Sequence, residues 1–318
     1  MSKGLRLLAP FVLATALVRP AGAFDLEGHR GTRGLAPENT LAAFRKALAI
    51  GVTTLETDLA VTRDNVLVLS HEPYLNPALT RDGSGRFLSA NGPDIHAIDL
   101  AALRRYDVGR LNPGHSYGKG FPEQVPADGE RMPTLDELFA LAREQGTVRL
   151  NLETKITPGG EHGVPDPATF ARLVLAAIDR SGMAERIAVQ SFDWRTLVEI
   201  KRQRPRQATA CLTIVASSMN TVQADASGAS PWHAGLKLAD HGSLPRLVKA
   251  AGCETWSMFW RNLTPPLAAE AKALGLKVLP WTVNDPGQMA QLIDLGVDGL
   301  ITDYPDRLRK VLAAKGMR

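Results

Sequence analysis

The stretch LETDLAVTRDNVLVLSHE, Leu55–Glu72, decides how this chain is interpreted. Its first half is typical of a strand, so the side chains of Glu56 and Asp58, two positions apart, point to the same side. Residues 63–65 favour a tight turn, and the apolar run after them leads to His71. The pattern predicts a hairpin that brings a histidine close to two carboxylates. Such a group suggests a hard-cation site with an acid–base residue beside it, although an edge hairpin with solvated acids fits the same stretch.

Outward from this stretch, strand-like runs alternate with helix-like segments. If residues 66–70 are the return arm of the hairpin, the remaining strands number eight and begin at Asp25, Thr54, Thr147, Ile187, Ala208, Glu254, Lys277 and Val297. The helices expected among them span residues 41–50, 134–145, 167–180, 194–203, 243–251, 265–274, 286–295 and 304–314. Eight strands separated by helices predict an α/β fold, the TIM (β/α)₈ barrel. An open doubly wound sheet is the alternative, but no glycine-rich dinucleotide turn follows the first strand.

Residues 74–133 interrupt this alternation. They are rich in glycine, proline and asparagine, and only residues 100–106 look helical. A loop-dominated insertion of this length is usually a lid or a binding wall. A disordered linker is the alternative, but aromatic and long apolar residues between Phe87 and Phe121 argue against it.

Residues 1–23 have the features of a secretory signal peptide. Lys3 and Arg6 precede a short apolar run, and a small-x-small cleavage site ends at Ala23. The apolar run is too short to span a bilayer and no later segment replaces it, so we expect no stable membrane span. A retained N-terminal anchor is the alternative. We therefore expect a periplasmic or secreted protein in which residues 24–318 form a single barrel domain.

Removal of the signal segment also changes the charge of the chain. The 318 residues are 44% hydrophobic and 22% charged, with a formal net charge of +4. Three basic residues and no acidic residue lie in residues 1–23, so the rest of the chain has a net charge of +1. This balance gives no support for binding of nucleic acid or another polyanion. Cys211 and Cys253 either pair, as an oxidising compartment allows, or remain buried thiols. The sequence leaves that choice and the oligomeric state open.

In a TIM barrel the chemistry takes place where strands end. The predicted strands end in His29-Arg30, Glu56/Asp58, Glu153/Lys155, Ser191/Asp193, Trp281/Asn284 and Asp303. Glu56, Asp58 and Glu153 are candidates for an oxygen-rich site that binds Mg²⁺ or Ca²⁺. Zinc is disfavoured because carboxylates dominate and the cysteines are remote.

The other strand-end residues suit a phosphate ester. Arg30 and Lys155 can neutralise a phosphate bound to the cation. His29 and His71 can divide the proton transfers, one deprotonating the attacking group and the other protonating the leaving alkoxide. These parts predict metal-assisted phosphodiester cleavage. Trp281 is expected either to contact the substrate or to pack in the barrel core.

Simpler interpretations exist for several of these residues. His29 can close the barrel floor, and Lys155 can be a solvated residue after a strand. Glu38 is either an ordinary acid at a helix N-terminus or part of the site. Asn39 or Thr40 is expected to cap the helix that follows.

Short segments in order along residues 25–306 resemble the motifs of the glycerophosphodiester phosphodiesterase family. They are HRG at 29–31, PENT at 37–40, ETD at 56–58, HE at 71–72, NLETK at 151–155, SFD at 191–193, WTVN at 281–284 and DGLITD at 298–303. Each segment is weakly specific alone, and the ordered set is specific.

The resemblance implies a TIM barrel in which residues 74–133 are a family insertion. It also implies that the three carboxylates bind the cation, Mg²⁺ or Ca²⁺, and that the two histidines transfer protons. Arg30 and Lys155 would then lie near the phosphate. It implies glycerophosphodiesters, such as glycerophosphocholine, as substrates that are hydrolysed to glycerol 3-phosphate and an alcohol. Secreted members of the family work in the periplasm, which agrees with the signal segment.

One position departs from the family pattern. The chain has His71-Glu72 where members usually have His-Asp, and the longer carboxylate can change the orientation of the histidine or the surroundings of the metal. Phosphatidylinositol-specific phospholipases C and sphingomyelinase D share parts of this layout and are the nearest enzymatic alternatives. A catalytically silent barrel that binds phosphodiesters is the alternative from another class.

Overall fold

The computed structural model describes residues 24–317, so the predicted signal segment lies outside the described residues. Parallel strands form the wall of a barrel in the order β8-β7-β6-β5-β4-β2-β1-β9. Their bounds are β1 (Asp25–Gly28), β2 (Thr54–Val61), β4 (Arg149–Thr154), β5 (Ile187–Ser191), β6 (Ala208–Thr213), β7 (Thr255–Met258), β8 (Lys277–Val278) and β9 (Gly299–Thr302). The Asp298 N–H donates to the Val278 carbonyl (3.0 Å), and this bond nearly closes the ring between β9 and β8. The predicted TIM barrel is confirmed.

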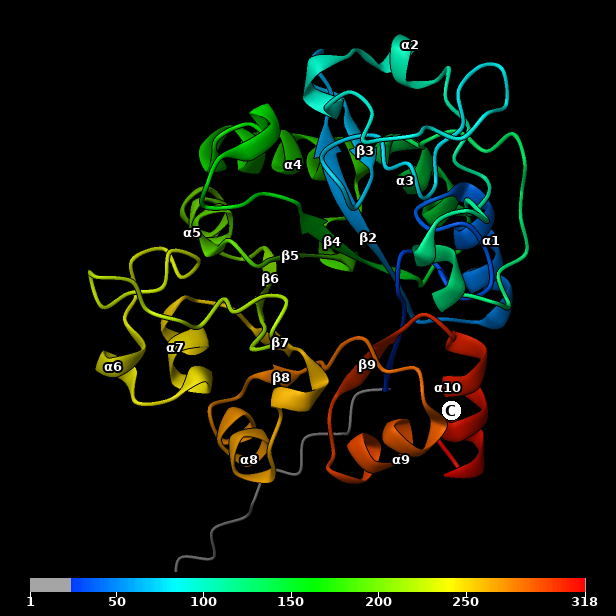
Figure 1. The fold of residues 1–318 in the computed structure, drawn as a ribbon. Coiled ribbons are helices and arrows are strands. Elements are labelled where there is room, and N and C mark those ends of the chain that lie inside the picture. The colour runs from blue at the N-terminus through cyan, green and yellow to red at the C-terminus, as the bar shows by residue number, and fades with distance from the viewer. Residues whose placement is uncertain (1–23, 318) are drawn as a thin grey trace, which may run out of the picture.

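Helices surround the strands on the outside of the barrel (Figure 1). They are α1 (Leu41–Ile50), α3 (Leu135–Glu144), α4 (Pro167–Ser181), α5 (Trp194–Gln203), α7 (Leu244–Ala250), α8 (Pro265–Ala273), α9 (Pro286–Asp294) and α10 (Pro305–Ala314). The short helices α2 (Leu100–Leu103) and α6 (Leu238–His241) lie in loop-rich segments. No helix within residues 24–317 has the length and apolar character needed to cross a membrane.

Local capping explains where these helices begin and end. The Thr40 hydroxyl accepts a hydrogen bond from the Ala43 N–H (3.2 Å), and Gly51 ends α1 with a φ of 88°. Helix α3 begins with the capping box that the spacing of Thr134 and Glu137 predicts. Thr40 is therefore the cap of α1, and the proposal that Asn39 caps it is wrong.

Two predicted elements are much longer than the observed ones. The strand expected at residues 277–283 is regular only over Lys277–Val278, because Pro280 has no N–H to donate to a neighbouring strand. The helix expected at residues 100–106 ends at Leu103.

The predicted hairpin is present. Strand β3 (Leu67–Leu69) pairs antiparallel with β2, and Asn65 takes a left-handed φ of 60° in the turn between them. The Ser70 N–H donates to the Asp58 carbonyl (3.0 Å), which brings His71 close to Asp58 of β2.

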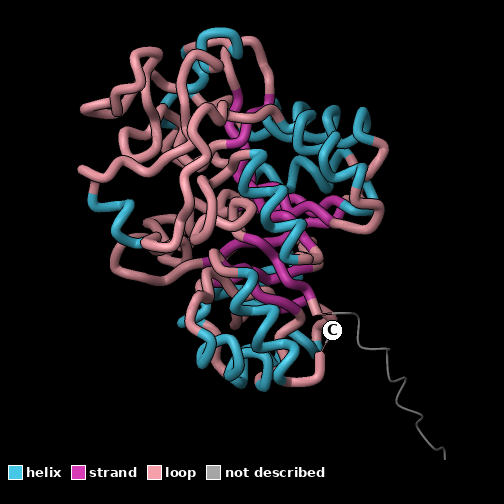
Figure 2. Tube along the Cα trace, turned by 90° about the vertical axis from the view of Figure 1, so that its right-hand side faces the viewer, coloured by secondary structure: helices cyan, strands magenta, loops and turns pink. Residues whose placement is uncertain are grey.

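The insertion at residues 74–133 packs on this hairpin. A small apolar cluster joins the two and contains Ala60, Val68, Leu75, Ile95, Leu103 and Met132. Figure 2 shows most of the loops gathered on one side of the strands. The insertion is thus a packed part of the molecule rather than a linker, while the main core lies between the barrel and its helices.

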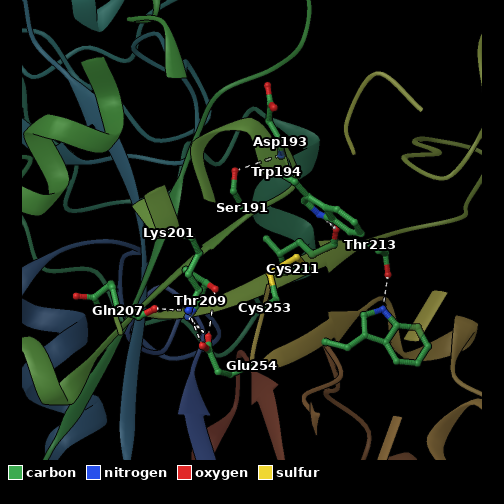
Figure 3. Close-up of a disulfide and its surroundings, with 12 residues drawn as sticks. Ser191, Asp193, Trp194, Lys201, Gln207, Thr209, Cys211, Thr213, Cys253 and Glu254 are labelled. Carbon is green, nitrogen blue, oxygen red and sulfur yellow. Dashed lines mark hydrogen bonds and ion pairs between the residues drawn. A yellow bond between two sulfur atoms is a disulfide. The ribbon is translucent and has the colours of Figure 1, made fainter. Parts of the chain in front are cut away.

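A disulfide joins Cys211 in β6 to Cys253, which lies two residues before β7. It links Cys211 to Cys253 over a sequence separation of 42, and both residues are buried. On one side of it, Glu254 accepts a hydrogen bond from the Thr209 N–H (2.9 Å) and pairs with Lys201 (Figure 3). Of the two alternatives that the sequence leaves open for the cysteines, the structure has the disulfide.

Candidate active site

A cavity of about 180 Å³ lies at the carboxyl ends of the strands. The predicted site residues among those that line it are His29, Arg30, Glu56, His71, Glu153, Lys155 and Trp281. The remaining one, Asp58, is buried next to Glu56 and Glu153. A wider depression of about 530 Å³ lies beside α4 and α5 and has none of the predicted residues in its lining. The predicted residues therefore converge on one cavity.

The three carboxylates come from adjacent strands. Glu56 and Asp58 are two apart on β2, and the register places Glu153 of β4 directly opposite Asp58. One oxygen from each residue lies within 4.8 Å of the others. Burial, and then the neighbouring carboxylates of Asp58 and Glu153, raise the pKa of Glu56 well above its usual value. Three carboxylates this close strongly favour a bound positive charge.

The donor set fits a divalent cation. Burial alone would raise the pKa of Asp58, but the Arg30 guanidinium keeps that pKa below its usual range, so the carboxylate is ionised. Its Oδ1 is buried and has no hydrogen-bond partner within residues 24–317. A buried, ionised oxygen without a partner is costly. An all-oxygen set of ligands suits Mg²⁺ or Ca²⁺ better than softer metals.

Two cationic side chains flank the carboxylates. The Lys155 ammonium donates to Glu153 Oε1 (2.7 Å) and lies 3.7 Å from Asp58 Oδ1. The backbone N–H of Arg30 donates to Glu56 Oε2 (2.8 Å), and the side-chain Nε of Arg30 lies 3.2 Å from Asp58 Oδ2. The Lys155 side chain is only 16% exposed, so it is not a solvated residue after the strand.

Glu38 and Asn39 belong to the same network. Both are buried, and the Arg30 guanidinium donates to Glu38 Oε1 (2.6 Å). The Asn39 amide donates to Asp58 Oδ2 (3.0 Å) and accepts from the Thr57 hydroxyl (2.8 Å). Glu38 thus balances the charge of a cavity-lining arginine, and Asn39 orients a carboxylate.

Each predicted histidine contacts a carboxylate through Nδ1. His29 Nδ1 lies 2.6 Å from Asp303 Oδ1, and His71 Nδ1 lies 2.8 Å from Glu72 Oε1. An ionised carboxylate only accepts hydrogen bonds, so Nδ1 carries the proton of each neutral imidazole. The lone pair is then on Nε2 in both rings.

The surroundings keep both rings neutral near pH 7. Burial, and then the Arg33 guanidinium, lower the pKa of His29 against the opposing effect of Asp303. Burial, and then nearby cationic side chains, lower the pKa of His71 to about 4. Neutral rings with a free Nε2 have the protonation state that proton abstraction requires.

Trp281 lies at the wall of the cavity. Its ring packs edge-on against Phe192 with centroids 5.4 Å apart, and both residues line the cavity. Its Nε1 is buried and lacks a hydrogen-bond partner in the described part of the chain. The indole therefore combines core packing with a free donor beside the cavity.

Arg33, Tyr117 and Gln190 belong to the site, although the sequence analysis missed them. Arg33 donates from Nε (2.9 Å) and NH2 (3.1 Å) to the Asp303 carboxylate, and Gln190 donates to Glu56 Oε1 (3.0 Å). Gln190 was detectable as a polar residue in an apolar strand. Arg33 lies in a turn and Tyr117 in a short 3-10 helix, Ser116–Gly120, and no periodic pattern marks either residue.

A barrel that gathers carboxylates, histidines and cationic side chains at its strand ends has the arrangement of an enzyme active site. The family model of the glycerophosphoryl diester phosphodiesterase family matches residues 29–307, and the chain belongs to that family.

Similarity to known proteins in sequence and in structure supports this assignment. The chain is 27% identical to a glycerophosphodiester phosphodiesterase of Caldanaerobacter subterraneus subsp. tengcongensis, over 91% of this chain and 97% of that protein. It is 36% identical to a putative glycerophosphoryl diester phosphodiesterase of Silicibacter pomeroyi, whose crystal structure matches with a TM-score of 0.82 over 94% of this chain and 96% of that chain. An Oleispira antarctica phosphodiesterase, solved in complex with its product sn-glycerol-3-phosphate, shares the fold at 23% identity and a TM-score of 0.66, over 90% of this chain and 96% of that chain.

Proposed function

We propose that the protein hydrolyses glycerophosphodiesters, the deacylated headgroups of phospholipids, to glycerol 3-phosphate and an alcohol. The convergence of Glu56, Asp58 and Glu153 with two neutral histidines in one cavity carries the proposal. Family membership supports it, because the family is named for this reaction.

The three carboxylates would hold a divalent cation, Mg²⁺ or Ca²⁺. Such a cation supplies Lewis-acid stabilisation of the phosphoryl oxygens. Arg30 and Lys155 would bind the phosphate, the first as a bidentate fork and the second as a point charge. Trp281 would form part of the substrate wall.

His29 and His71 would exchange the protons of the reaction. Hydrolysis forms a bond from an attacking oxygen to phosphorus and breaks the bond to the alcohol oxygen. The Nε2 of one histidine takes the proton of the attacking oxygen. The other histidine first takes up a proton from solvent at its own Nε2 and then gives that proton to the leaving alkoxide. Detection of a transient cyclic glycerol phosphate would identify a substrate hydroxyl as the attacking group.

A panel of glycerophosphodiesters tests the function. The purified protein is incubated with glycerophosphocholine and related diesters with Mg²⁺ or Ca²⁺, and both products are identified. Release of glycerol 3-phosphate and the free alcohol is expected. A stable complex with uncleaved substrate in the presence of both metals would instead favour a carrier or receptor.

Metal removal is expected to abolish the activity. EDTA treatment leaves three buried carboxylates with no cation between them, and addition of Mg²⁺ or Ca²⁺ should restore turnover. A Glu153→Gln variant should bind the metal more weakly in a calorimetric titration, because one charged ligand is lost. Full activity after exhaustive chelation would contradict the cation's role.

Glu72 provides a test of histidine orientation. A Glu72→Ala variant is expected to lower kcat by about tenfold, because a hydrogen bond to a charged group is worth about 1.5 kcal/mol. A Glu72→Gln variant keeps an acceptor and should lose less. Wild-type kcat in the alanine variant would show that Glu72 does not orient His71.

We also propose that the protein acts in the periplasm or outside the cell. The signal-like residues 1–23 of the sequence and the Cys211–Cys253 disulfide support this location, because disulfides persist in oxidising compartments. N-terminal sequencing of the exported protein should find Phe24 as the first residue.

A further inference from the structure

Residues Ser116–Gly120 of the insertion place Tyr117 against the loop after β1. Its hydroxyl lies 3.1 Å from Arg33 NH1 and 3.4 Å from Arg30 NH1. The same hydroxyl donates a hydrogen bond to the Glu38 carboxylate. One side chain of the insertion therefore contacts both guanidinium groups and the carboxylate that pairs with Arg30.

Arg30 and Arg33 both line the cavity, and two like charges side by side repel each other. Glu38 balances the first (2.6 Å) and Asp303 the second (2.9 Å). Each of these carboxylates forms an ion pair with only one of the two arginines, whereas the Tyr117 hydroxyl accepts hydrogen bonds from both. A shared acceptor fixes the orientation of both planar groups without adding a charge that would repel an anion.

The docking of this segment does not depend on the hydroxyl. The Arg33 guanidinium lies 4.6 Å above the Phe121 ring, and the rings of Tyr117 and Phe121 are 5.3 Å apart. The Gln124 amide donates to the Arg33 carbonyl (2.7 Å). Loss of the hydroxyl alone should leave these contacts in place.

We propose that Tyr117 is a positioning residue that holds Arg30 and Arg33 together so that both bind the phosphate of the substrate. The inference rests on the proposed function, since it assigns the phosphate to this cavity. Part of each guanidinium is already engaged, since Arg33 donates from Nε and NH2 to Asp303 and Arg30 donates from NH1 to Glu38. The remaining N–H groups of two neighbouring arginines offer more donors to phosphate oxygens than those of one. The insertion then contributes to substrate binding by orienting residues of the barrel.

A Tyr117→Phe variant tests this role. The probe is glycerol 3-phosphate, whose Kd is measured by calorimetry, alongside kcat and KM for glycerophosphocholine. Kd and KM are expected to rise about five- to tenfold, with a smaller change in kcat. The matched control is Tyr106→Phe, since Tyr106 lies in the same insertion but packs on its apolar cluster. The control should leave all three values unchanged.

Thermal unfolding separates positioning from a merely structural role. A lower Tm with an unchanged Kd and KM in Tyr117→Phe would overturn the inference. The double variant, Tyr117→Phe with Arg33→Lys, should lose less affinity for glycerol 3-phosphate than the sum of the losses in the two single variants, because both substitutions remove the same contact. Additive losses of affinity would contradict the inference. An inactive wild-type protein would overturn the proposed function and this inference with it. An active wild type with an unaffected Tyr117→Phe variant overturns the inference alone.

Discussion

Replacement of either His29 or His71 by alanine is expected to lower kcat for glycerophosphocholine by about 10²- to 10⁴-fold. Each ring lines the cavity and carries its Nδ1 proton toward a carboxylate, so its Nε2 is the basic atom. An alanine removes that atom and leaves the carboxylates of the cation site unchanged. KM should change much less than kcat, because the phosphate is bound by other side chains.

His241→Ala is the matched control. His241 ends α6, away from the residues that line the cavity, and its loss should leave kcat unchanged. Metal affinity, measured by calorimetry, should also be retained in the His29 and His71 variants. Full activity of either variant would exclude that histidine from the proton transfers.

Loss of the Cys211–Cys253 disulfide is expected to lower the free energy of unfolding by about 4 kcal/mol. The reason is that the bond closes a loop and so reduces the conformational entropy of the unfolded chain. The sequence separation of 42 sets the size of that loop. For a chain of this size the change corresponds to a drop in Tm of roughly 6 °C. The measurement compares Cys211→Ala/Cys253→Ala with the wild-type protein in denaturant unfolding.

The reduced wild-type protein is the control for the disulfide. After unfolding and refolding with reductant it should match the double variant, except for the small cavity that the alanines leave. The cysteines are absent from the lining of the active-site cavity, so kcat at low temperature should change little. Equal stability of the oxidised and reduced proteins would contradict a stabilising bond.

Local sequence patterns were sufficient for much of the fold. The turn residues at 63–65 and the alternation of Glu56 and Asp58 predict the hairpin and the carboxylate pair, because both depend on neighbours in the chain. The bounds of the main helices follow from caps such as Thr134 with Glu137. The regular part of β8 was overestimated, since an apolar run does not show how far ladder bonds extend past Pro280.

The rest of the site depends on contacts between distant loops. Tyr117 meets Glu38 across 79 residues, and Gln190 meets Glu56 across 134 residues. Such pairs leave no spacing signature in a single sequence. The role of Asn39 was likewise hidden, because its amide reaches Asp58 from a left-handed backbone conformation with a φ of 55°. Composition equally fails to decide whether Cys211 and Cys253 pair.

The contact between His29 and Asp303 joins residues 274 positions apart, at the ends of the first and last strands. Strand β1 pairs with β9, so this contact forms only when the two ends of the chain meet. Pairings at such long range make a fold of high contact order and slow its formation. Orientation of the histidine is therefore coupled to closure of the ring. A nascent chain that lacks its last strand also lacks Asp303, so the proton transfer proposed for His29 would become possible only after synthesis and folding are complete.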